Sequence, residues 1–405
     1  MHKYFTIFIA LLIFFSCSQQ KPELKIKQAI VRIENGLIEF KSPAGMFQPD
    51  SAQRANPVKI AERMEFYKVP GVSIAVINNF QIEWAKAYGV MNANTSEPVT
   101  TETIFEAAST SKFITAVIAL HFAQKGLIDL DANVNDYLKS WQVPENEFTA
   151  NEKVTLRRLL IHKAGLPMTN FSHDENAEYP SLIDVLNGKL PALNKPAFPE
   201  YVPGTQWQYS NVGYDVIQLL LEDVSGKPFQ QIADEIVFEP LGMDNSTFEY
   251  PLDSEGKKRE AMPHDNAGAL REPSMHLTAL AHAGLTTTPT DLAKFTNEIM
   301  LAYQGKSEKI LSQEMTRRLL HKEFDLDPRM FGIPLSEGLG VLVMGEGKDL
   351  LFSHPGSNLP GLNCWLIAWP DRGTAAIVMT NGAEGEVLAM EIIAAINLEY
   401  NKKIE

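Results

Sequence analysis

Apolar residues gather near both ends of the chain, and each region predicts a pair of strands. In the first region, a helix-like stretch over residues 58–67 precedes the β-branched run 72–77. Asn78 and Asn79 then provide a turn before the run 81–88. The two runs therefore predict a β-hairpin.

The second apolar region lies near the carboxyl end of the chain. Residues 362–369 and 374–380 flank the turn sequence Pro-Asp-Arg-Gly at 370–373, which predicts another pair of strands. Residues 386–400 follow with an amphipathic helical pattern. Because strands occur at both ends with helical segments between them, we expect an antiparallel sheet that the chain leaves and later rejoins.

The middle of the chain is predicted to be helical. Residues 113–122 are apolar on nearly every side, which is typical of a helix buried all round, and 154–162 and 211–224 predict further helices. The predicted fold class is α+β, with an all-α lobe inserted between two parts of an α/β lobe. We expect one folded unit over 56–402, with the α/β lobe over 56–110 and 275–402 and the helical lobe over 111–274.

The beginning of the chain predicts export. Residues 1–16 join a short positive start to an apolar run that is too short to cross a bilayer but fits a secretory signal peptide. Cys17 follows a small residue at the end of this run, which resembles the lipobox of bacterial lipoproteins, although Phe14 stands where leucine is usual. We expect a lipidated Cys17, a polar tether over 17–55, and a cell-membrane or outer-membrane lipoprotein facing the periplasm or the exterior. Ordinary signal cleavage, with Cys17 incidental, is the alternative.

Composition limits the partners. The chain is 45% hydrophobic and 21% charged, as globular proteins are, and its net charge is -14. Clustered basic residues are absent from the sequence, which argues against nucleic acid as the working partner. Cys17 and Cys364 are the two cysteines, so a lipidated Cys17 leaves no intrachain disulfide. Cys364 lies in an apolar stretch and is expected to be a buried, inert thiol.

Three Ser-x-x-Lys elements occur in the sequence, and one of them lies in a context that suggests chemistry. The elements at 18–21 and 254–257 stand at the signal boundary and in a polar segment, so both are interpreted as chance. Ser109 and Lys112 instead stand at the start of the buried helix. The helix is the informative signal, since chance gives about one or two such spacings in a chain of this length.

This context predicts a nucleophile and its base. Residues three apart on a helix share one face, so Lys112 is within hydrogen-bonding reach of Ser109. Free backbone N–H groups at a helix start stabilise a developing oxyanion. Burial lowers the pKa of a lysine, so a neutral Lys112 amine can take the proton of Ser109. The alternative is a helix-capping serine beside a surface lysine.

Two later triplets carry further candidates. Tyr209 stands two residues before Asn211; a phenol beside an ammonium group ionises more easily and can relay a proton, and the Asn211 amide can bind a substrate carbonyl. A tight turn with Asn211 as a helix cap is the alternative. Later, His354 and Gly356 precede the second hairpin. Gly356 allows close approach of a substrate, and we expect the N–H of Ser357 to complete an oxyanion hole with that of Ser109. A strand–loop junction with an incidental His354 is the alternative.

In this order, Ser-x-x-Lys, Tyr-x-Asn and the triplet ending at Gly356 resemble the class C β-lactamase and penicillin-binding-protein superfamily. The resemblance is strongest to its β-lactamase-related serine hydrolase branch, which includes esterases and D-amino-acid peptidases. Supporting segments between about 60 and 385 are Phe-Glu-Ala-Ala at 105–108, Leu-Ile-His-Lys-Ala-Gly-Leu-Pro at 160–167, Leu-Gly-Met at 241–243, residues 284–292, and Gly-Leu-Gly at 338–340.

The resemblance implies a β-lactamase/transpeptidase-like fold with its active site between the lobes. It implies an acyl-enzyme on Ser109, proton transfer by Lys112 and Tyr209, and substrate binding by Asn211. Neither a cofactor nor a metal is expected, and the partner would be a small-molecule or peptide substrate: a D-amino-acid peptide, a small ester or, weakly, a β-lactam. The oligomeric state stays open.

The third triplet departs from the family pattern. Members that hydrolyse β-lactams efficiently usually carry Lys-Thr-Gly there, which binds the substrate carboxylate. His354 is largely neutral at pH 7, and Pro355 offers neither a hydroxyl nor an N–H and predicts an edge strand. An esterase or peptidase is therefore favoured over a strong β-lactamase.

Two other interpretations were weighed. A lipoprotein that binds penicillin or wall peptides and acylates slowly is the rival from another class, but an intact Ser109, Lys112 and Tyr209 argue against it. The sequence Gly-Val-Ser-Ile-Ala at 71–75 is close to Gly-x-Ser-x-Gly, but Ser73 lies inside a strand pattern rather than at a strand-to-helix turn.

Overall fold

The computed structural model describes residues 23–39, 56–169, 172–173, 177–273, 278–359 and 361–400. The signal peptide over 1–16 and the lipidation of Cys17 therefore lie outside the described residues and stay predictions. Within the described ranges, no helix combines the length and the apolar content that crossing a bilayer requires.

The regular elements are the following. The strands are β1 (Gly71–Asn78), β2 (Gln81–Asn92), β3 (Glu97–Pro98), β4 (Phe105–Glu106), β5 (Thr286–Thr287), β6 (Phe324–Asp325), β7 (Ser336–Glu337), β8 (Leu342–Met344), β9 (Leu351–Asn358), β10 (Leu362–Trp369) and β11 (Thr374–Thr380). The helices are α3 (Ile60–Tyr67), α4 (Ser111–Gln124), α5 (Leu156–Leu160), α6 (Leu182–Asn187), α7 (Asn211–Ser225), α8 (Phe229–Ala233), α9 (Glu239–Leu241), α10 (Ser254–Lys257), α11 (Pro289–Tyr303), α12 (Gln313–Leu319), α13 (Pro328–Phe331) and α14 (Gly385–Tyr400). Short 3-10 segments are η2 (Ala108–Thr110), η3 (Val134–Asp136) and η5 (Gly347–Asp349), and η4 (Asp234–Phe238) is a π-helical turn.

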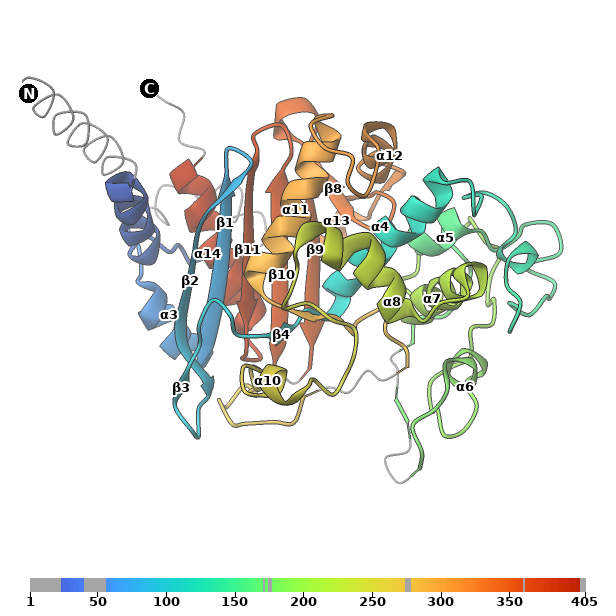
Figure 1. Cartoon of the computed structure of the whole chain (residues 1–405), viewed down its shortest axis with the longest axis horizontal. Helices are drawn as coiled ribbons and strands as arrows, with labels where there is room; N and C mark the ends of the chain where they lie inside the picture. Colours follow the sequence, from blue (N-terminus) through green and yellow to red (C-terminus); the bar gives the residue numbers. More distant parts are fainter. Residues whose placement is uncertain are drawn as a thin grey trace, which may run out of the picture.

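One antiparallel sheet joins the two ends of the chain. Its strand order is β3-β2-β1-β11-β10-β9-β8-β7-β6, so β1 from the first hairpin pairs directly with β11 from the last. Val76 lies opposite Ala376 in this pairing. Figure 1 shows the sheet lobe beside a lobe of helices from the middle of the chain, as the α+β prediction required.

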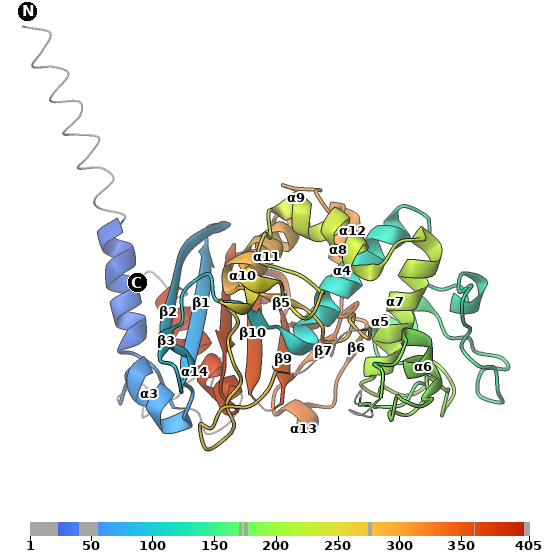
Figure 2. The ribbon, with the colours of Figure 1, turned by 60° about the horizontal axis from the view of Figure 1, so that its bottom comes forward.

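The sheet is buried on both faces. Successive residues of a strand point to opposite faces, and in β1 this places Ile74 and Val76 in the core under α14 and Ala75 and Ile77 in the core under α11. Figure 2 shows α11 and α14 on opposite sides of the sheet. The apolar run in β1 follows from this double burial.

The predicted tether is wrong over its first part. Residues 23–34 form a helix, although the sequence analysis expected an irregular segment over 17–55. Ile33 is buried in the same core as α14, and the Arg32 guanidinium binds the Glu399 carboxylate with N–O distances of 2.5–3.1 Å. Apolar residues three or four positions apart indicate this helix. The pattern is hard to recognise because many charged residues lie between them.

A buried ion pair joins α3 to α14. The Arg63 guanidinium donates to both carboxylate oxygens of Glu391 at 2.8 and 2.6 Å, and the Tyr67 hydroxyl donates to Glu391 at 2.8 Å. The side chains of the pair are 7% and 0% exposed, so water cannot solvate either charge if its partner is removed.

We expect Glu391→Gln to lower the free energy of unfolding by about 3–5 kcal/mol, because it leaves the Arg63 charge buried without its counterion. Glu62→Gln is the matched control on α3, since Glu62 pairs with Lys59 at the surface, and it should cost no more than about 1 kcal/mol. Urea unfolding followed by circular dichroism measures both. Equal effects of the two variants would show that the buried pair does not stabilise this contact.

Candidate active site

Ser109 lies in a strained turn rather than in the helix itself. Strand β4 leads into the 3-10 turn η2, and α4 begins only at Ser111, so the prediction that Ser109 begins the helix is off by two residues. Ala108, directly before it, has a φ of 48°, a left-handed conformation that costs a non-glycine residue about 1 kcal/mol or more. The Thr110 hydroxyl ties this turn to β9 by donating to the carbonyl of His354 at 3.1 Å.

Lys112 is buried directly behind the serine. Its side chain is 0% exposed, and Nζ lies 3.2 Å from Ser109 Oγ and 2.8 Å from the carbonyl oxygen of His282. Burial lowers the pKa of Lys112 to about 7, while the charge of Asp215 acts in the opposite direction. The neutral amine that the sequence predicted is therefore accessible near neutral pH.

Helix α7 fixes the carbonyl that holds Lys112. The His282 ring nitrogen Nδ1 lies 2.7 Å from Asp215 Oδ1, and Gln218 accepts the N–H groups of Leu280 and Ala281 at 2.8 and 3.2 Å. These side chains position the backbone of residues 280–282 against α4. Sequence reasoning missed them, because the segment lies more than 160 residues after Lys112.

Tyr209 lies on the other side of the serine. Its hydroxyl donates to Ser109 Oγ at 2.9 Å, and Lys112 Nζ lies 4.7 Å from the centre of its ring. The expectation that the phenol ionises easily is wrong, because burial raises the pKa of Tyr209 above its ordinary range. Tyr209 therefore stays protonated near neutral pH and serves as a hydrogen-bond donor or proton relay.

His162 supports Tyr209 and was missed as a site residue. The two rings have centroids 4.5 Å apart, and His162 Nδ1 accepts the N–H of Ser210 at 3.1 Å. A nitrogen that accepts carries no proton, so the neutral ring is protonated at Nε2. Burial and the nearby Lys112 lower the pKa of His162 well below its ordinary value. The segment 160–167, which contains His162, supported the family resemblance in the sequence. No sequence signal indicated a role for the His162 ring.

Asn211 begins α7 and stands behind the cavity. Its amide nitrogen donates to the carbonyl of Thr169 at 3.1 Å, and the residue does not line the cavity described below. Ser210 caps the helix by accepting the N–H of Gly213 at 3.1 Å. The local role of Asn211 is to fix the segment around Thr169, and its contact with substrate stays a prediction.

The third motif lies on β9, beside the serine turn. The Pro355 carbonyl can only accept, so His354 Nδ1, 2.9 Å away, carries the ring proton. Burial, together with the charge of Lys112, lowers the pKa of His354 to about 3, which leaves the ring neutral. The edge-strand prediction is wrong, because β9 lies between β10 and β8. Pairing with β8 ends at Ser353, however, so the strand has a free side at Pro355.

Gly356 is required by close packing against the nucleophile turn. A Cβ atom there would lie 2.1 Å from the carbonyl oxygen of Ala107 and 3.0 Å from the backbone nitrogen of Ser109. The sequence predicted that Gly356 lets a substrate approach closely. In the structure, the backbone of the Ser109 turn itself lies close to Gly356. The Ser357 hydroxyl donates to Asn363 at 2.8 Å, and the role of its N–H in an oxyanion hole stays a prediction.

A cavity of about 360 Å³ opens in front of Ser109. Its polar wall includes Tyr209, His162 and His354, and its apolar wall includes Met168, Trp207, Met330, Leu342 and Trp365. Glu337 and Glu386 complete the polar lining, and none of the described residues that line the cavity is lysine or arginine. Sequence reasoning missed Trp207 and Glu337, which no motif marked.

The other candidate groups lie elsewhere. Ser254 and Lys257, on α10, are exposed, and Ser73 is buried within β1, so the structure gives neither serine a nucleophile environment. Cys364 is buried on β10, where burial raises the pKa of its thiol to about 12, as expected for an inert cysteine. In the part of the chain that is described, His, Cys, Asp and Glu side chains form no group of three that could hold a metal ion.

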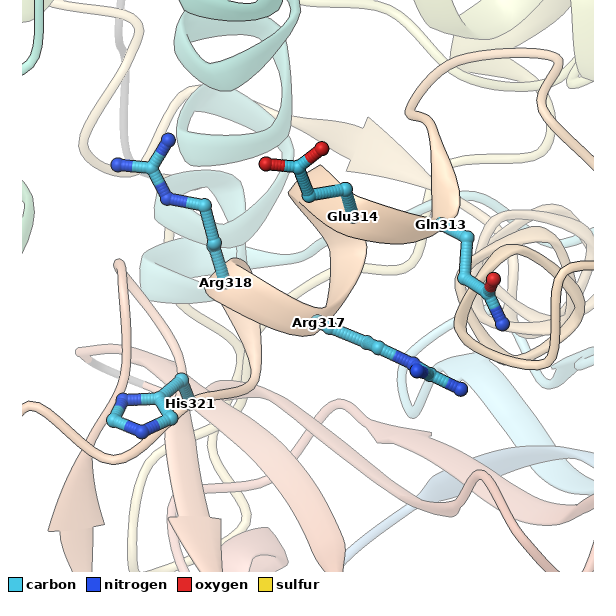
Figure 3. Close-up of a pocket in the computed structure, with 5 residues that line it drawn as sticks. All are labelled: Gln313, Glu314, Arg317, Arg318 and His321. Atoms are coloured by element: carbon cyan, nitrogen blue, oxygen red, sulfur yellow. The ribbon is translucent and has the colours of Figure 1, made fainter.

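A second hollow lies on the surface at α12. It is lined by Gln313, Glu314, Arg317, Arg318 and His321. Figure 3 shows these side chains diverging from the helix, with Arg318 and Arg317 pointing in different directions. Because the charged groups do not converge, the hollow lacks the arrangement of a catalytic centre.

Comparisons with known proteins agree with this geometry. Protein flp of Staphylococcus aureus (strain MW2) is 24% identical over 249 residues, which cover 60% of this chain and 48% of that protein. The match thus spans about half the length of that relative. A β-lactamase from Pseudomonas fluorescens is 28% identical over 252 residues, covering 62% of this chain and 64% of that protein.

The fold is similar to that of solved penicillin-binding-protein homologues. The octameric homologue from Pyrococcus abyssi superposes with a TM-score of 0.70 at 24% identity, over 83% of this chain and 75% of that one. Residues 59–400 match the Beta-lactamase family, which includes the whole sheet and every side chain placed around Ser109. The chain therefore belongs to the Beta-lactamase family and has a β-lactamase/transpeptidase-like fold.

Proposed function

We propose that the protein is a serine acyl-hydrolase that forms an acyl-enzyme on Ser109 with an ester or amide substrate. The observation that carries the proposal is the fully buried Lys112, whose Nζ lies 3.2 Å from Ser109 Oγ. Its pKa of about 7 leaves a substantial fraction of neutral amine at neutral pH. A base whose pKa lies near the working pH is the most effective one for proton transfer.

The proposed acylation needs only groups that this site contains. Ser109 Oγ attacks the substrate carbonyl carbon while its proton passes to Lys112 Nζ, and the carbonyl oxygen becomes an oxyanion. When the bond to the leaving alcohol or amine breaks, that group takes the proton from Lys112, directly or through the Tyr209 hydroxyl, 2.9 Å from Oγ. A water molecule then attacks the acyl carbon and gives a proton to Lys112 Nζ, the bond to Ser109 Oγ breaks, and Oγ takes that proton as the carboxylic acid leaves.

The lack of a lysine or arginine among the described residues that line the cavity supports a small ester or a peptide amide over a β-lactam. A penicillin carboxylate needs a cation, and His354 is held neutral by burial. Glu337 and Glu386 line the same cavity, and no lysine or arginine does so among its described residues. The second candidate function is a lipoprotein that binds penicillin or wall peptides and is acylated slowly. It is retained because a similar solved structure is named as a penicillin-binding protein homologue. Turnover of a chromogenic ester would exclude it.

We also propose that Cys17 is lipidated and that the domain lies near its membrane. Residues 18–22 alone separate Cys17 from residue 23, the first described residue of the helix, and five residues span at most about 18 Å even when fully extended. The packing of that helix on α14 through Arg32 and Glu399 supports a short connection instead of a long tether.

Ser109→Ala should reduce hydrolysis of p-nitrophenyl acetate by at least about 10³-fold, and Lys112→Ala should reduce it nearly as much, because the two groups act as a unit. Ser254→Ala and Lys257→Ala are matched controls, since they remove an exposed pair of the same spacing. Initial rates and circular dichroism check activity and folding together. Activity retained in the Ser109 variant would refute the nucleophile assignment.

The kcat/KM of the ester should rise with pH between about 6 and 8, with a midpoint near 7, and then level off. Lys112 acts only as the neutral amine, and its lowered pKa of about 7 places the loss of its proton in that interval. The rate is followed at a wavelength where both forms of nitrophenol absorb equally. A midpoint near 10 would mean that Lys112 is not desolvated, and a midpoint near 4 would assign the base to a carboxylate.

Cys17→Ser should move the protein from the membrane fraction to the soluble fraction when it is expressed with its own leader in a bacterial host. The thioether attachment of a lipid requires the cysteine sulfur, whereas signal cleavage alone does not. Cys364→Ser is the control, because that thiol is buried in β10. Unchanged membrane recovery of the Cys17 variant would indicate another anchor, and recovery of the unmodified protein in the soluble fraction would favour ordinary signal cleavage.

A further inference from the structure

Glu337 is a buried carboxyl on the cavity wall that the proposed acyl transfer does not use. It is 4% exposed, and its Oε2 accepts the indole N–H of Trp207 at 3.2 Å. Strand β7 is held on both sides, with Glu337 opposite Phe324 of β6 and opposite Leu342 of β8. The carboxyl therefore has a fixed position beside the space in front of Ser109.

The protonation of this carboxyl follows from its surroundings. Burial raises the pKa of Glu337 to about 8, and the hydrogen bond from Trp207 only partly opposes this. The group is thus mostly protonated at pH 7. Because the indole can only donate, Oε2 accepts and the acid proton lies on Oε1. Among the described residues, the indole is the one donor that binds the Glu337 carboxyl, so Oε1 is left to carry the proton on a side chain that lines the cavity.

Among the described residues, no cation pairs with Glu337. The titratable groups on the packed elements are Tyr209 and His162, which line the cavity, Tyr214, which is buried on α7, and Glu323, Asp325 and Arg157 around β6. Arg157 is bound by Glu323 at 2.9 Å and by Asp131 at 2.7 Å, and Lys163 lies 3.7 Å from the centre of the Phe324 ring. These cations are engaged elsewhere, so the neutral acid is the form that fits this wall.

We propose that Glu337 is a specificity-determining residue that donates a hydrogen bond to an uncharged acceptor oxygen on the acyl group of the substrate. Trp207 and Leu342 lie beside Glu337, and Met330, Met168 and Trp365 add apolar surface to the same cavity. The favoured acyl groups are therefore apolar and uncharged, with one keto, amide or ether oxygen. Leaving a buried donor without an acceptor costs free energy. A substrate with an acceptor oxygen avoids this cost and therefore binds more tightly than one with a plain alkyl group. The inference rests on the proposed serine hydrolase function.

The test compares p-nitrophenyl hexanoate with its 4-oxo and 5-oxo analogues and with an ester of 4-(trimethylammonio)butanoate. The measured quantity is kcat/KM of each ester divided by that of hexanoate for the same variant, so that a general change in activity cancels. We expect at least one oxo ester to be favoured by roughly 5- to 10-fold in the unmodified protein, mainly through KM.

Three variants identify the donor. Glu337→Gln keeps an N–H donor and should keep the oxo preference, whereas Glu337→Leu should lose it. Above about pH 8 the preference should fall in the unmodified protein but not in the Glu337→Gln variant, because a carboxylate cannot donate. Glu314→Gln, on the exposed surface of α12, is the matched control and should change no ratio.

The outcomes separate this inference from the function on which it rests. If Ser109→Ala hydrolyses hexanoate as the unmodified protein does, the nucleophile assignment fails. If Ser109 is required but no oxo ester is preferred, or Glu337→Leu keeps the preference, the inference alone fails. A preference for the trimethylammonium ester that Glu337→Gln abolishes would overturn it as well, since Glu337 would then act as a carboxylate that binds cations.

Discussion

The site depends on the burial of Lys112, which no carboxylate of the described residues contacts. An ammonium group in this position is costly to desolvate, and the protein offers it a hydroxyl and a carbonyl instead of a counterion. This desolvation cost is reduced when the amine gives up its proton. The burial of Lys112 is therefore also what makes the neutral amine available as a base. Helix α4 can bury the amine because its residues are enclosed on nearly every side.

Both lobes are needed to keep that amine in place. The sheet lobe supplies β9, whose Gly356 packs against the backbone of the Ser109 turn. The helical lobe supplies α7, whose Asp215 and Gln218 fix the backbone that ends in the His282 carbonyl. A change in either lobe therefore reaches the reacting atoms through backbone contacts, even where the altered side chain lies away from the cavity.

Burial also sets the charge of the cavity wall. It lowers the pKa of His162 and His354 and raises the pKa of Tyr209 and Glu337, so each of these groups is driven toward its neutral form. A wall of neutral groups gives little attraction to a substrate carboxylate, and this is the physical basis for proposing esters and small amides. Directional hydrogen bonds then decide which neutral substrate fits best.

Local patterns along the chain were enough to predict several parts of the protein. The two hairpins, the buried helix with Lys112, and the order of Ser109, Tyr209 and His354 could all be predicted from the alternation of apolar residues and from motif spacing. The helix over 23–34 was missed, because its narrow apolar stripe is surrounded by charged residues.

The protonation states and the long-range contacts instead follow from packing between segments that are distant in sequence. Tyr209 was expected to ionise easily, but its pKa depends on burial by segments that no local pattern describes. The pairing of β9 between β10 and β8, the His282 carbonyl beside Lys112, and the indole of Trp207 on Glu337 each join residues far apart in sequence. A motif specifies which chemical groups are present. The pKa of each group depends on how far the folded protein excludes water from it, which no motif describes.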